Sequence, residues 1–337
     1  MNRRIIFSLT LGAIALFLIV FGVFRFIEYQ QAKKVNEEVK EPYSWDSRIV
    51  LQDYERKNVG GKTYAYKPGL TNILLLGVDT QGALEEQKVN RGNGQCDAIY
   101  LVTIDNVNWT VDILQLDRDT MTPITTTDIF GKPNGTEVAQ ICLSYSYGNG
   151  TSTSCQNAVE AVRYLLGGIP IDHVASINIS AIEPLIDAIG GVKMLIETDM
   201  SDQDPALVEG ETVTLNGHQA ELYVRSRREV DDGRNASRMK RQRAFIQALM
   251  ETVMDKLKND QTDATSWYEA MEPYTYLDSE FTTFLSFFSQ AADPNYTRHE
   301  IVTPAGEHDY TKDYAEFNID KDALNNLILQ LWYKEYK

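Results

Sequence analysis

The sequence predicts an α/β fold: a three-layer α-β-α domain with a central mixed sheet, behind an N-terminal transmembrane helix. Apolar runs of strand length alternate with amphipathic segments of helix length from residue 71 onward, and no strong linker interrupts them. Such alternation is typical of a sheet covered by helices on both faces. The 337 residues are 43% hydrophobic and 24% charged, an ordinary globular composition that can bury one large core.

The N-terminus carries the signal of a membrane anchor. Ile5–Phe24 is a run of twenty residues without a charge, long enough to cross a bilayer core of roughly 30 Å as a helix. Arg3 and Arg4 precede the run, which predicts a cytoplasmic N-terminus and an extracytoplasmic remainder. The alternative, a cleaved signal peptide, would have an apolar run of roughly 7–15 residues and a small-residue cleavage site. Here Arg25 follows directly.

Three segments are therefore expected: 1–27 as cytoplasmic end and transmembrane helix, 28–69 as a polar stalk, and 70–337 as one extracytoplasmic domain. Within this domain, buried strands are expected where apolar runs are bounded by turn residues. The runs are 72–79 (NILLLGVD), 97–105 (DAIYLVTID), 109–117 (WTVDILQLD), 173–179 (HVASINI) and 192–198 (VKMLIET). A further strand is predicted at 223–227 (YVRSR), where two arginines alternate onto one face.

Helices are predicted where apolar residues recur at helical spacing and stop signals follow. The segment 154–168 ends in Gly167 and Gly168, and the segment 180–191 begins with Ser180 as its cap and ends at Gly190. A long helix is expected to begin at Asn235 or Ser237 and to run to about Lys258. Two more amphipathic helices are expected at 279–292 and 320–336.

The charge is distributed unevenly along the chain. A net charge of −16 and a pI near 4.7 argue against nucleic-acid binding, which needs a broad basic surface. Yet residues 222–245 hold eight of the 32 basic residues and only three acidic ones. Such a cluster repels itself unless an anion or a set of carboxylates lies among it.

The long helix explains how this cluster can form a pocket. Arg238, Arg241 and Gln242 share one helix face with Phe245 and Leu249, which must point toward the core. A phosphate at this helix N-terminus would complement the helix dipole, the backbone amides and the guanidinium groups.

Arg225 and Arg227, on the predicted strand just upstream, are expected to converge on the same place. We interpret the set as an anion-binding pocket. The alternative is a structural network between these arginines and the carboxylates of Glu229, Asp231 and Asp232.

Candidate metal ligands lie at the strand ends. Asp79 ends one predicted strand, Asp97 begins the next, and Arg118 follows the third. Ligands of open α/β sheets bind outside the carboxyl ends of strands, and carboxylates beside phosphate oxygens are a typical Mg²⁺ setting. The simpler alternative for each aspartate is a turn or cap residue. Since no nucleophile elbow, P-loop or dinucleotide motif is present, the pattern favours phosphoryl chemistry by positioning and charge stabilisation.

At this point the chain resembles the LytR–CpsA–Psr family, over roughly Thr71 to Leu249. The motifs that carry the resemblance are NILLLGVDT, CDAIYLVTID, LQLDRDTM, CLSYSYGNG, LIDAIGGVKM, GETVTLNGHQAELYVRSR and RMKRQRAFIQAL, in this order. The resemblance implies a membrane-anchored extracytoplasmic phosphotransferase of cell-wall biogenesis. Such enzymes transfer an anionic glycopolymer, such as teichoic acid or capsule, from an undecaprenyl-pyrophosphate carrier to peptidoglycan through a phosphodiester.

The resemblance also implies roles for particular residues. Asp79 and Asp97 are similar to the carboxylates that hold Mg²⁺, or Mn²⁺ in its place. The pyrophosphate-binding set is Arg118, Arg225, Arg227, Arg238 and Gln242, and the catalytic set is Asp79, Asp97, Arg118, Arg225 and Arg227. The family's polyprenyl carrier implies an apolar pocket between sheet and helices. The helices at 154–168 and 180–191 are apolar enough to line it, but the sequence alone favours ordinary core for both.

Two departures from the family pattern affect this site. The family usually has arginine two residues before the second aspartate, but this chain has Gln95, and Arg91 is a candidate replacement. The usual D-F-G-R run reads Asn235-Ala236-Ser237-Arg238. Both departures leave the pairing of carboxylates with arginines open.

Other functions use the same residues. A polyprenyl-pyrophosphate hydrolase would use water as acceptor, and a non-catalytic envelope sensor would only bind phosphorylated polyprenyl lipids. Transfer to a surface protein instead of peptidoglycan is a variant of the first function. The sequence does not identify the donor glycan.

The three cysteines allow one disulfide outside the cell. Cys96 and Cys155 lie at a strand start and a helix start, whereas Cys142 lies in an apolar helical run. A disulfide, if one forms, is therefore expected between Cys96 and Cys155. The alternative is three free buried thiols.

Overall fold

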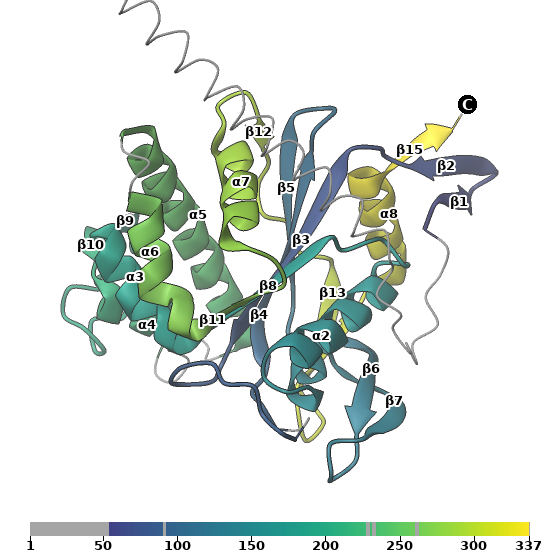
Figure 1. Cartoon of the computed structure of the whole chain (residues 1–337), viewed down its shortest axis with the longest axis horizontal. Helices are drawn as coiled ribbons and strands as arrows, with labels where there is room; N and C mark the ends of the chain where they lie inside the picture. The colour runs from purple at the N-terminus through teal and green to yellow at the C-terminus, as the bar shows by residue number, and fades with distance from the viewer. Residues whose placement is uncertain (1–53, 90–91, 227–229, 231–233, 260–262, 337) are drawn as a thin grey trace, which may run out of the picture. The chain divides into compact units, whose positions relative to one another are not determined.

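The computed structural model describes residues 54–89, 92–226, 230, 234–259 and 263–336 (Figure 1). All of them belong to one compact unit. None of the described helices is long and apolar enough to cross a membrane. The predicted anchor, Ile5–Phe24, lies outside the described residues.

A six-stranded mixed sheet forms the centre of this unit, as the sequence predicts. Its strand order is β11-β8-β3-β4-β5-β12. Parallel pairing joins β3 to β8 and β5 to β12, and the other neighbours are antiparallel. The strands are β3 Leu70–Val78, β4 Cys96–Asp105, β5 Thr110–Leu116, β8 His173–Asn178, β11 Thr275–Leu277 and β12 Thr297–Arg298.

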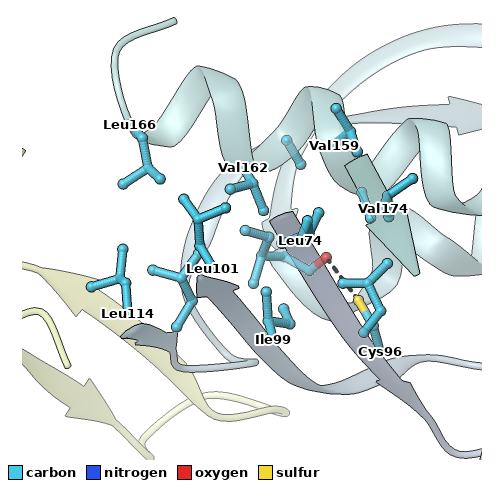
Figure 2. Packing of buried hydrophobic residues seen from close by; sticks show 14 of the residues in the cluster. Leu74, Cys96, Ile99, Leu101, Leu114, Val159, Val162, Leu166 and Val174 are labelled. Atoms are coloured by element: carbon cyan, nitrogen blue, oxygen red, sulfur yellow. Dashed lines mark hydrogen bonds between the residues drawn. The ribbon is translucent and has the colours of Figure 1, made fainter. Parts of the chain in front are cut away.

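Helices cover both faces of the sheet, because alternate side chains of its strands are apolar on both sides. Leu74 and Leu101 pack against α2 (Ser152–Leu165) on one face (Figure 2). Side chains of α8 (Lys321–Trp332) belong to the same cluster. Ile73 and Ile104 pack on the other face, with α5 (Asn235–Asn259) and α7 (Phe281–Ala292). Figure 1 shows the two helical layers on opposite sides of β3 to β5, which confirms the three layers.

A second apolar cluster lies beside the sheet, centred on Tyr223, Phe245 and Trp267. It joins the elements between β8 and β11 to one face of α5. These are α3 Ile182–Ile189, β9 Val192–Leu195, β10 Thr212–Leu215, α4 Gly217–Arg225 and α6 Asp263–Met271. As predicted, α3 ends at Gly190, whose φ of 85° is left-handed. The turn before it is capped by Asn178, which accepts from the Ser180 N–H, and not by Ser180 itself.

The two ends of the described chain meet. β2 (Lys62–Tyr66) pairs with β1 (Arg56–Val59) on one side and with β15 (Tyr333–Tyr336) on the other, so part of the segment predicted as a stalk joins the folded domain. The last predicted helix likewise ends at Trp332 and continues as β15. The buried side-chain oxygen of Asn72 accepts from Trp332 Nε1 at 2.9 Å and from Thr103 Oγ1 at 2.8 Å, which fixes this junction.

The remaining elements are short. They are the hairpins β6–β7 (Met121–Thr127 and Pro133–Gln140) and β13–β14 (Gly306–Asp309 and Glu316–Ile319), and the 3-10 turns Ile141–Tyr147, Ile179–Ala181 and Glu272–Tyr274. Both hairpins reach the edge of the sheet that carries the candidate site.

The strand predicted at 223–227 is wrong. Tyr223, Val224 and Arg225 form the last turn of α4. This helix begins with a capping box in which the Asn216 side chain accepts from the Gln219 N–H and the Gln219 side chain accepts in return from the Asn216 N–H. The capping box outweighs the β propensity of Tyr223 and Val224, and its sequence signal is the Asn-x-x-Gln spacing.

The predicted Cys96–Cys155 disulfide is also wrong. All three cysteines are free and buried. The Cys96 thiol lies 3.4 Å from the carbonyl oxygen of Cys142, since Cys96 is the first residue of β4 and points into the core. Cys142 lies in the 3-10 turn Ile141–Tyr147, close to its predicted helical setting.

We expect none of the three thiols to react in the folded protein. Burial raises the pKa of Cys142 to about 11 and that of Cys155 to about 12, so thiolate is scarce at neutral pH. Iodoacetamide at pH 8 should add no mass to the native chain and three carbamidomethyl groups after denaturation. A denatured, unreduced chain that takes only one group would instead show a disulfide.

Candidate functional site

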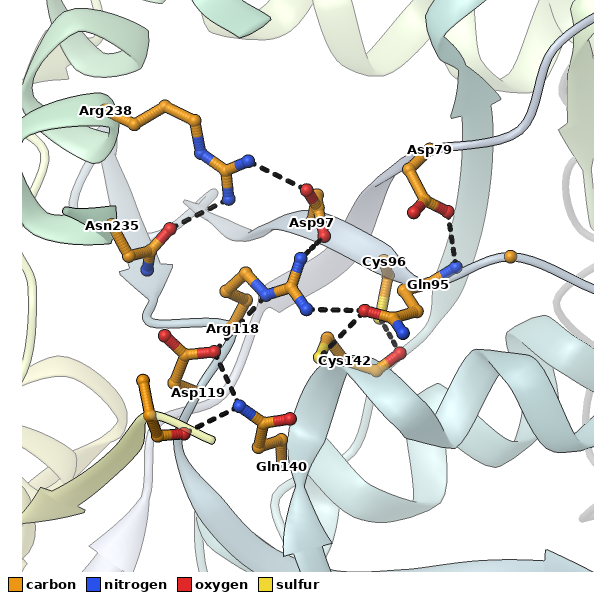
Figure 3. Close-up of polar contacts among 12 residues, drawn as sticks. Asp79, Gln95, Cys96, Asp97, Arg118, Asp119, Gln140, Cys142, Asn235 and Arg238 are labelled. Carbon is orange, nitrogen blue, oxygen red and sulfur yellow. Dashed lines mark hydrogen bonds and ion pairs between the residues drawn. The ribbon is translucent and has the colours of Figure 1, made fainter. Parts of the chain in front are cut away.

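The candidate site lies at one edge of the central sheet. Because β4 is antiparallel to both β3 and β5, the end of β3, the start of β4 and the end of β5 meet there. Asp79 follows β3, Asp97 is the second residue of β4, and Arg118 lies in the turn after β5. The N-terminus of α5 brings Arg238 to the same edge (Figure 3).

Asp97 links two arginines from distant parts of the chain. One carboxylate oxygen contacts Arg118 Nη1, and the other accepts from Arg238 Nη1 at 2.8 Å. The arginine side chains are 13% and 5% exposed, and that of Asp97 is 20% exposed. At this burial each guanidinium depends on its partners, and removal of the shared carboxylate leaves two buried cations poorly compensated. Asp97 is therefore the centre of the cluster.

Arg118 has two further partners. Its Nη2 donates to Gln95 Oε1, and its Nε lies 3.3 Å from Asp119 Oδ1. Gln95 thus contacts Arg118 where the family usually has a second arginine, and Arg91 lies outside the described residues. Gln140 Nε2, at the end of β7, donates to the same oxygen of Asp119 at 2.8 Å.

Asp79 differs from Asp97 in being exposed to solvent. Its Oδ1 accepts from the Gln95 N–H at 2.7 Å, and its own N–H donates to the Gln95 carbonyl at 3.1 Å. These bonds hold Asp79 beside the start of β4, one strand away from Asp97. Two carboxylates at neighbouring strand ends, with phosphate and water for the remaining positions, are a donor set that fits Mg²⁺ or Mn²⁺.

Arg241 and Gln242 are turned inward on α5, as their spacing predicts, but they contact the protein itself. Arg241 is 2% exposed and donates to the backbone carbonyls of Tyr223, at 3.2 Å, and Ser226. Gln242 Nε2 donates to the Val224 carbonyl at 3.3 Å. These carbonyls are the unsatisfied acceptors at the C-terminus of α4. Arg241 is therefore structural.

The structure does not bring Arg225 to the cluster. The Arg225 side chain is 51% exposed and pairs with Glu221 at 2.8 Å, one turn back on α4. Arg227 and the carboxylates of Glu229, Asp231 and Asp232 lie outside the described residues. Of the predicted pyrophosphate-binding set, Arg118 and Arg238 thus meet directly around Asp97.

Sequence reasoning missed Asn235 and Gln140. The Asn235 side-chain oxygen accepts from Arg238 Nη2 at 2.8 Å, and the i, i+3 spacing on α5 is a usable signal for this pair. Gln140 gives no such signal, because its contact depends on the pairing of β6 with β7.

Several apolar side chains between the sheet and α5 are only partly buried. Leu75, Ala98 and Val102 on the sheet face Ile246 and Met250 of α5 within one cluster, and all five keep some solvent exposure. Ile73 and Ile104 in the same layer are buried, as Leu74 and Leu101 are on the opposite face.

Substitution of Arg241 by alanine is expected to lower the free energy of unfolding by about 2–4 kcal/mol, because it leaves buried carbonyls at the end of α4 without donors. Thermal unfolding of the detergent-solubilised chain measures the loss. Lys240→Ala is the matched control, since Lys240 is 64% exposed and its ion pair with Glu197 is a surface contact. Equal melting temperatures for the two variants would contradict a structural role.

Comparisons with known proteins identify relatives of this chain. The model of the LytR_cpsA_psr family matches residues 28–331. The polyisoprenyl-teichoic acid–peptidoglycan teichoic acid transferase TagU of Bacillus anthracis is 26% identical over 250 residues, covering 74% of this chain and 71% of that protein.

Two solved structures share the fold. Protein gbs0355 of Streptococcus agalactiae superposes with a TM-score of 0.62 at 24% identity, covering 77% of this chain and 87% of that one. TagT bound to LIIa-WTA superposes with a TM-score of 0.57 at 20% identity, covering 78% and 90%.

Proposed function

The chain belongs to the LytR–CpsA–Psr family, and from this premise we propose that it is a phosphotransferase that attaches an anionic glycopolymer to peptidoglycan. The donor in this proposal is the glycopolymer on an undecaprenyl-pyrophosphate carrier. The observation that carries the proposal is the pair Arg118 and Arg238, held by Asp97 at a sheet edge beside the N-terminus of α5. The acceptor follows from relatives that are named peptidoglycan teichoic acid transferases.

The reaction is a displacement at the glycan-side phosphorus. A hydroxyl oxygen of peptidoglycan bonds to this phosphorus, and the bridging P–O bond of the pyrophosphate breaks. Undecaprenyl phosphate leaves with the bridging oxygen and takes up the hydroxyl proton. Arg118 and Arg238 stabilise the charge that moves onto the leaving phosphate, because charge-assisted hydrogen bonds strengthen as that charge grows. Arg227 is proposed to complete the pyrophosphate site. Arg225 and Gln242, which contact Glu221 and the Val224 carbonyl, would join it on leaving these partners.

The divalent cation is part of the same proposal. Asp79 and Asp97 would hold Mg²⁺ or Mn²⁺, which would neutralise phosphate oxygens and polarise the phosphorus. The protein's own side chains would orient the donor. Asp97 fixes both guanidinium groups, and the Gln95 backbone N–H fixes the Asp79 carboxylate.

A surface that would fit the carrier lipid lies between the sheet and α5. The partly buried side chains of Leu75, Val102 and Met250 offer apolar contacts between the sheet and α5. A polyprenyl chain that entered here would place its pyrophosphate at the sheet edge. The predicted anchor at Ile5–Phe24 would keep the domain within reach of that lipid.

Incubation of the full chain with an undecaprenyl-pyrophosphate glycan, Mg²⁺ and peptidoglycan fragments tests the proposal. We expect mass spectrometry to detect the coupled product and undecaprenyl phosphate in equal amounts. Glycan phosphate released without coupling would instead identify a hydrolase, and an unchanged donor that stays bound would identify a lipid-binding sensor.

A further inference from the structure

Arg238 is held by a second buried contact besides Asp97. Asn235 Oδ1 accepts from Arg238 Nη2 at 2.8 Å, while Asn235 Nδ2 donates to Asp117 Oδ1 at 2.8 Å. Asp117 Oδ2 lies 2.9 Å from Nε2 of His308. Asp117 is 3% exposed and Asn235 is 7% exposed, so these contacts are shielded from water.

The orientation of the Asn235 amide decides whether it can hold Arg238. A guanidinium only donates hydrogen bonds, so the amide must present its oxygen to Arg238 and turn its NH₂ group away. An ionised carboxylate only accepts, and Asp117 therefore stabilises this orientation of the amide and opposes the flipped one. Asp117 thus acts on Arg238 through Asn235.

The C-terminal hairpin, β13–β14, supports the turn that contains Asp117. The Phe317 N–H donates to the Asp119 carbonyl at 2.8 Å, and Gln140 Nε2 bridges Asp119 to the Ala315 carbonyl. His308, on β13, packs against the ring of Phe317. Residues 306–319, outside the segment that resembles the family motifs, therefore contribute to the position of Arg118 and Arg238.

The same group also has the composition of a cation site, since ligand atoms of Asp117, Asp119 and His308 lie within 4.8 Å of one another. The carboxylates, however, already take N–H donors. Asp117 Oδ1 accepts from Asn235 and from the Asp119 N–H, and Asp119 Oδ1 accepts from Gln140. These donors compensate the charge that a cation would otherwise neutralise, which favours a positioning network.

We propose that Asp117 and Asn235 are positioning residues that set the Arg238 guanidinium for the pyrophosphate, with His308 extending the network into the C-terminal hairpin. The proposal rests on the proposed function, because it assigns the two residues a part in that reaction. Neither residue touches the phosphate in it.

An exchange of the acid and the amide provides the test. Asn235→Asp places two carboxylates next to each other and should lower kcat/KM for transfer by about a hundred-fold, whereas Asp117→Asn keeps an acceptor and should lower it by about ten-fold. The double variant, Asp117→Asn with Asn235→Asp, restores one acid and one amide. It should recover to within about ten-fold of the wild-type kcat/KM.

Binding of inorganic pyrophosphate to the full chain, measured by calorimetry in Mg²⁺, provides a second readout that needs no turnover. Its affinity should follow the same order: wild type, then the double variant, then Asn235→Asp. Melting temperatures of all variants check the fold, and Asp112→Asn is the matched control. Asp112 also pairs with a histidine, His299, at 2.7 Å. This pair lies near the start of β5, and its histidine is exposed.

The outcomes separate this inference from the proposed function. Wild-type values in Asn235→Asp, or a double variant no better than Asn235→Asp, would overturn the positioning role. If pyrophosphate affinity follows the expected order across the variants but the wild type yields no coupled product, the proposed function is refuted and the network remains supported. Failure of the wild type in both assays would refute both.

Discussion

Asp97→Asn is expected to reduce the rate of transfer by about a thousand-fold, because a neutral amide cannot balance Arg118 and Arg238 together. Both guanidinium groups are largely buried and both contact this carboxylate. An asparagine has one acceptor oxygen, so one arginine would face an NH₂ group and turn away. Measured kcat/KM for the reconstituted reaction gives the effect, which should appear in kcat as well as in KM.

Asp105→Asn is the matched control for this variant. Asp105 lies at the other end of β4, where its carboxylate accepts from the N–H groups of Val107 and Asn108. The control should lower stability to a similar or smaller degree while it keeps transfer near the wild-type rate. If Asp97→Asn also kept that rate with a normal melting temperature, the shared carboxylate would not be part of the site.

The strand ends could be predicted from the sequence because each depends on a short local pattern. A continuous apolar run followed by Asp79, or by Asp117 and Arg118, identifies a buried strand and the residues just beyond it. The inward direction of Arg238 and Arg241 follows equally from helical spacing with Phe245. Local periodicity therefore predicts which face a side chain takes.

What an inward side chain contacts could not be predicted in this way. Arg238 reaches Asp97, whereas Arg241, three residues later, reaches the carbonyls at the end of α4. The difference arises from the packing of α4 against α5, a long-range contact that spacing does not encode. The predicted convergence of Arg225 on the anion pocket failed for a related reason. The segment 223–227 was assigned to a strand, which placed Arg225 on a face directed at the anion.

The contacts of the C-terminal part depend on tertiary structure in the same sense. His308 and Phe317 meet the turn after β5 across about half of the chain, through an isolated parallel bridge between Thr120 and Phe317. Cys96 and Cys142 are brought together in the same manner, from β4 and the turn after β7. No pattern within either segment indicates its partner.

The second large effect concerns the metal. We expect transfer to be lost in excess chelator, restored by Mg²⁺ or Mn²⁺, and reduced by about a hundred-fold or more in Asp79→Ala. Glu85→Ala is the control, because Glu85 is an exposed carboxylate in the same connection between β3 and β4. It should retain wild-type turnover and the same metal requirement.

The structure sharpens the reason for this expectation. Asp97 already balances two arginines, so its charge beside a phosphate is compensated without a cation. Asp79 is exposed and accepts from the Gln95 N–H, a neutral donor. Among the described residues no arginine or lysine pairs with Asp79, so its charge beside a phosphate is repulsive. A divalent cation between Asp79 and the phosphate removes that repulsion.

The metal requirement should therefore depend on Asp79 more than on Asp97. Metal affinity should be weak without the pyrophosphate, because two carboxylates supply few of the ligands that Mg²⁺ needs. If the wild type kept full activity in chelator while Asp79→Ala lost it, Asp79 would act by holding the start of β4 through Gln95, and the cation would have no place in the mechanism.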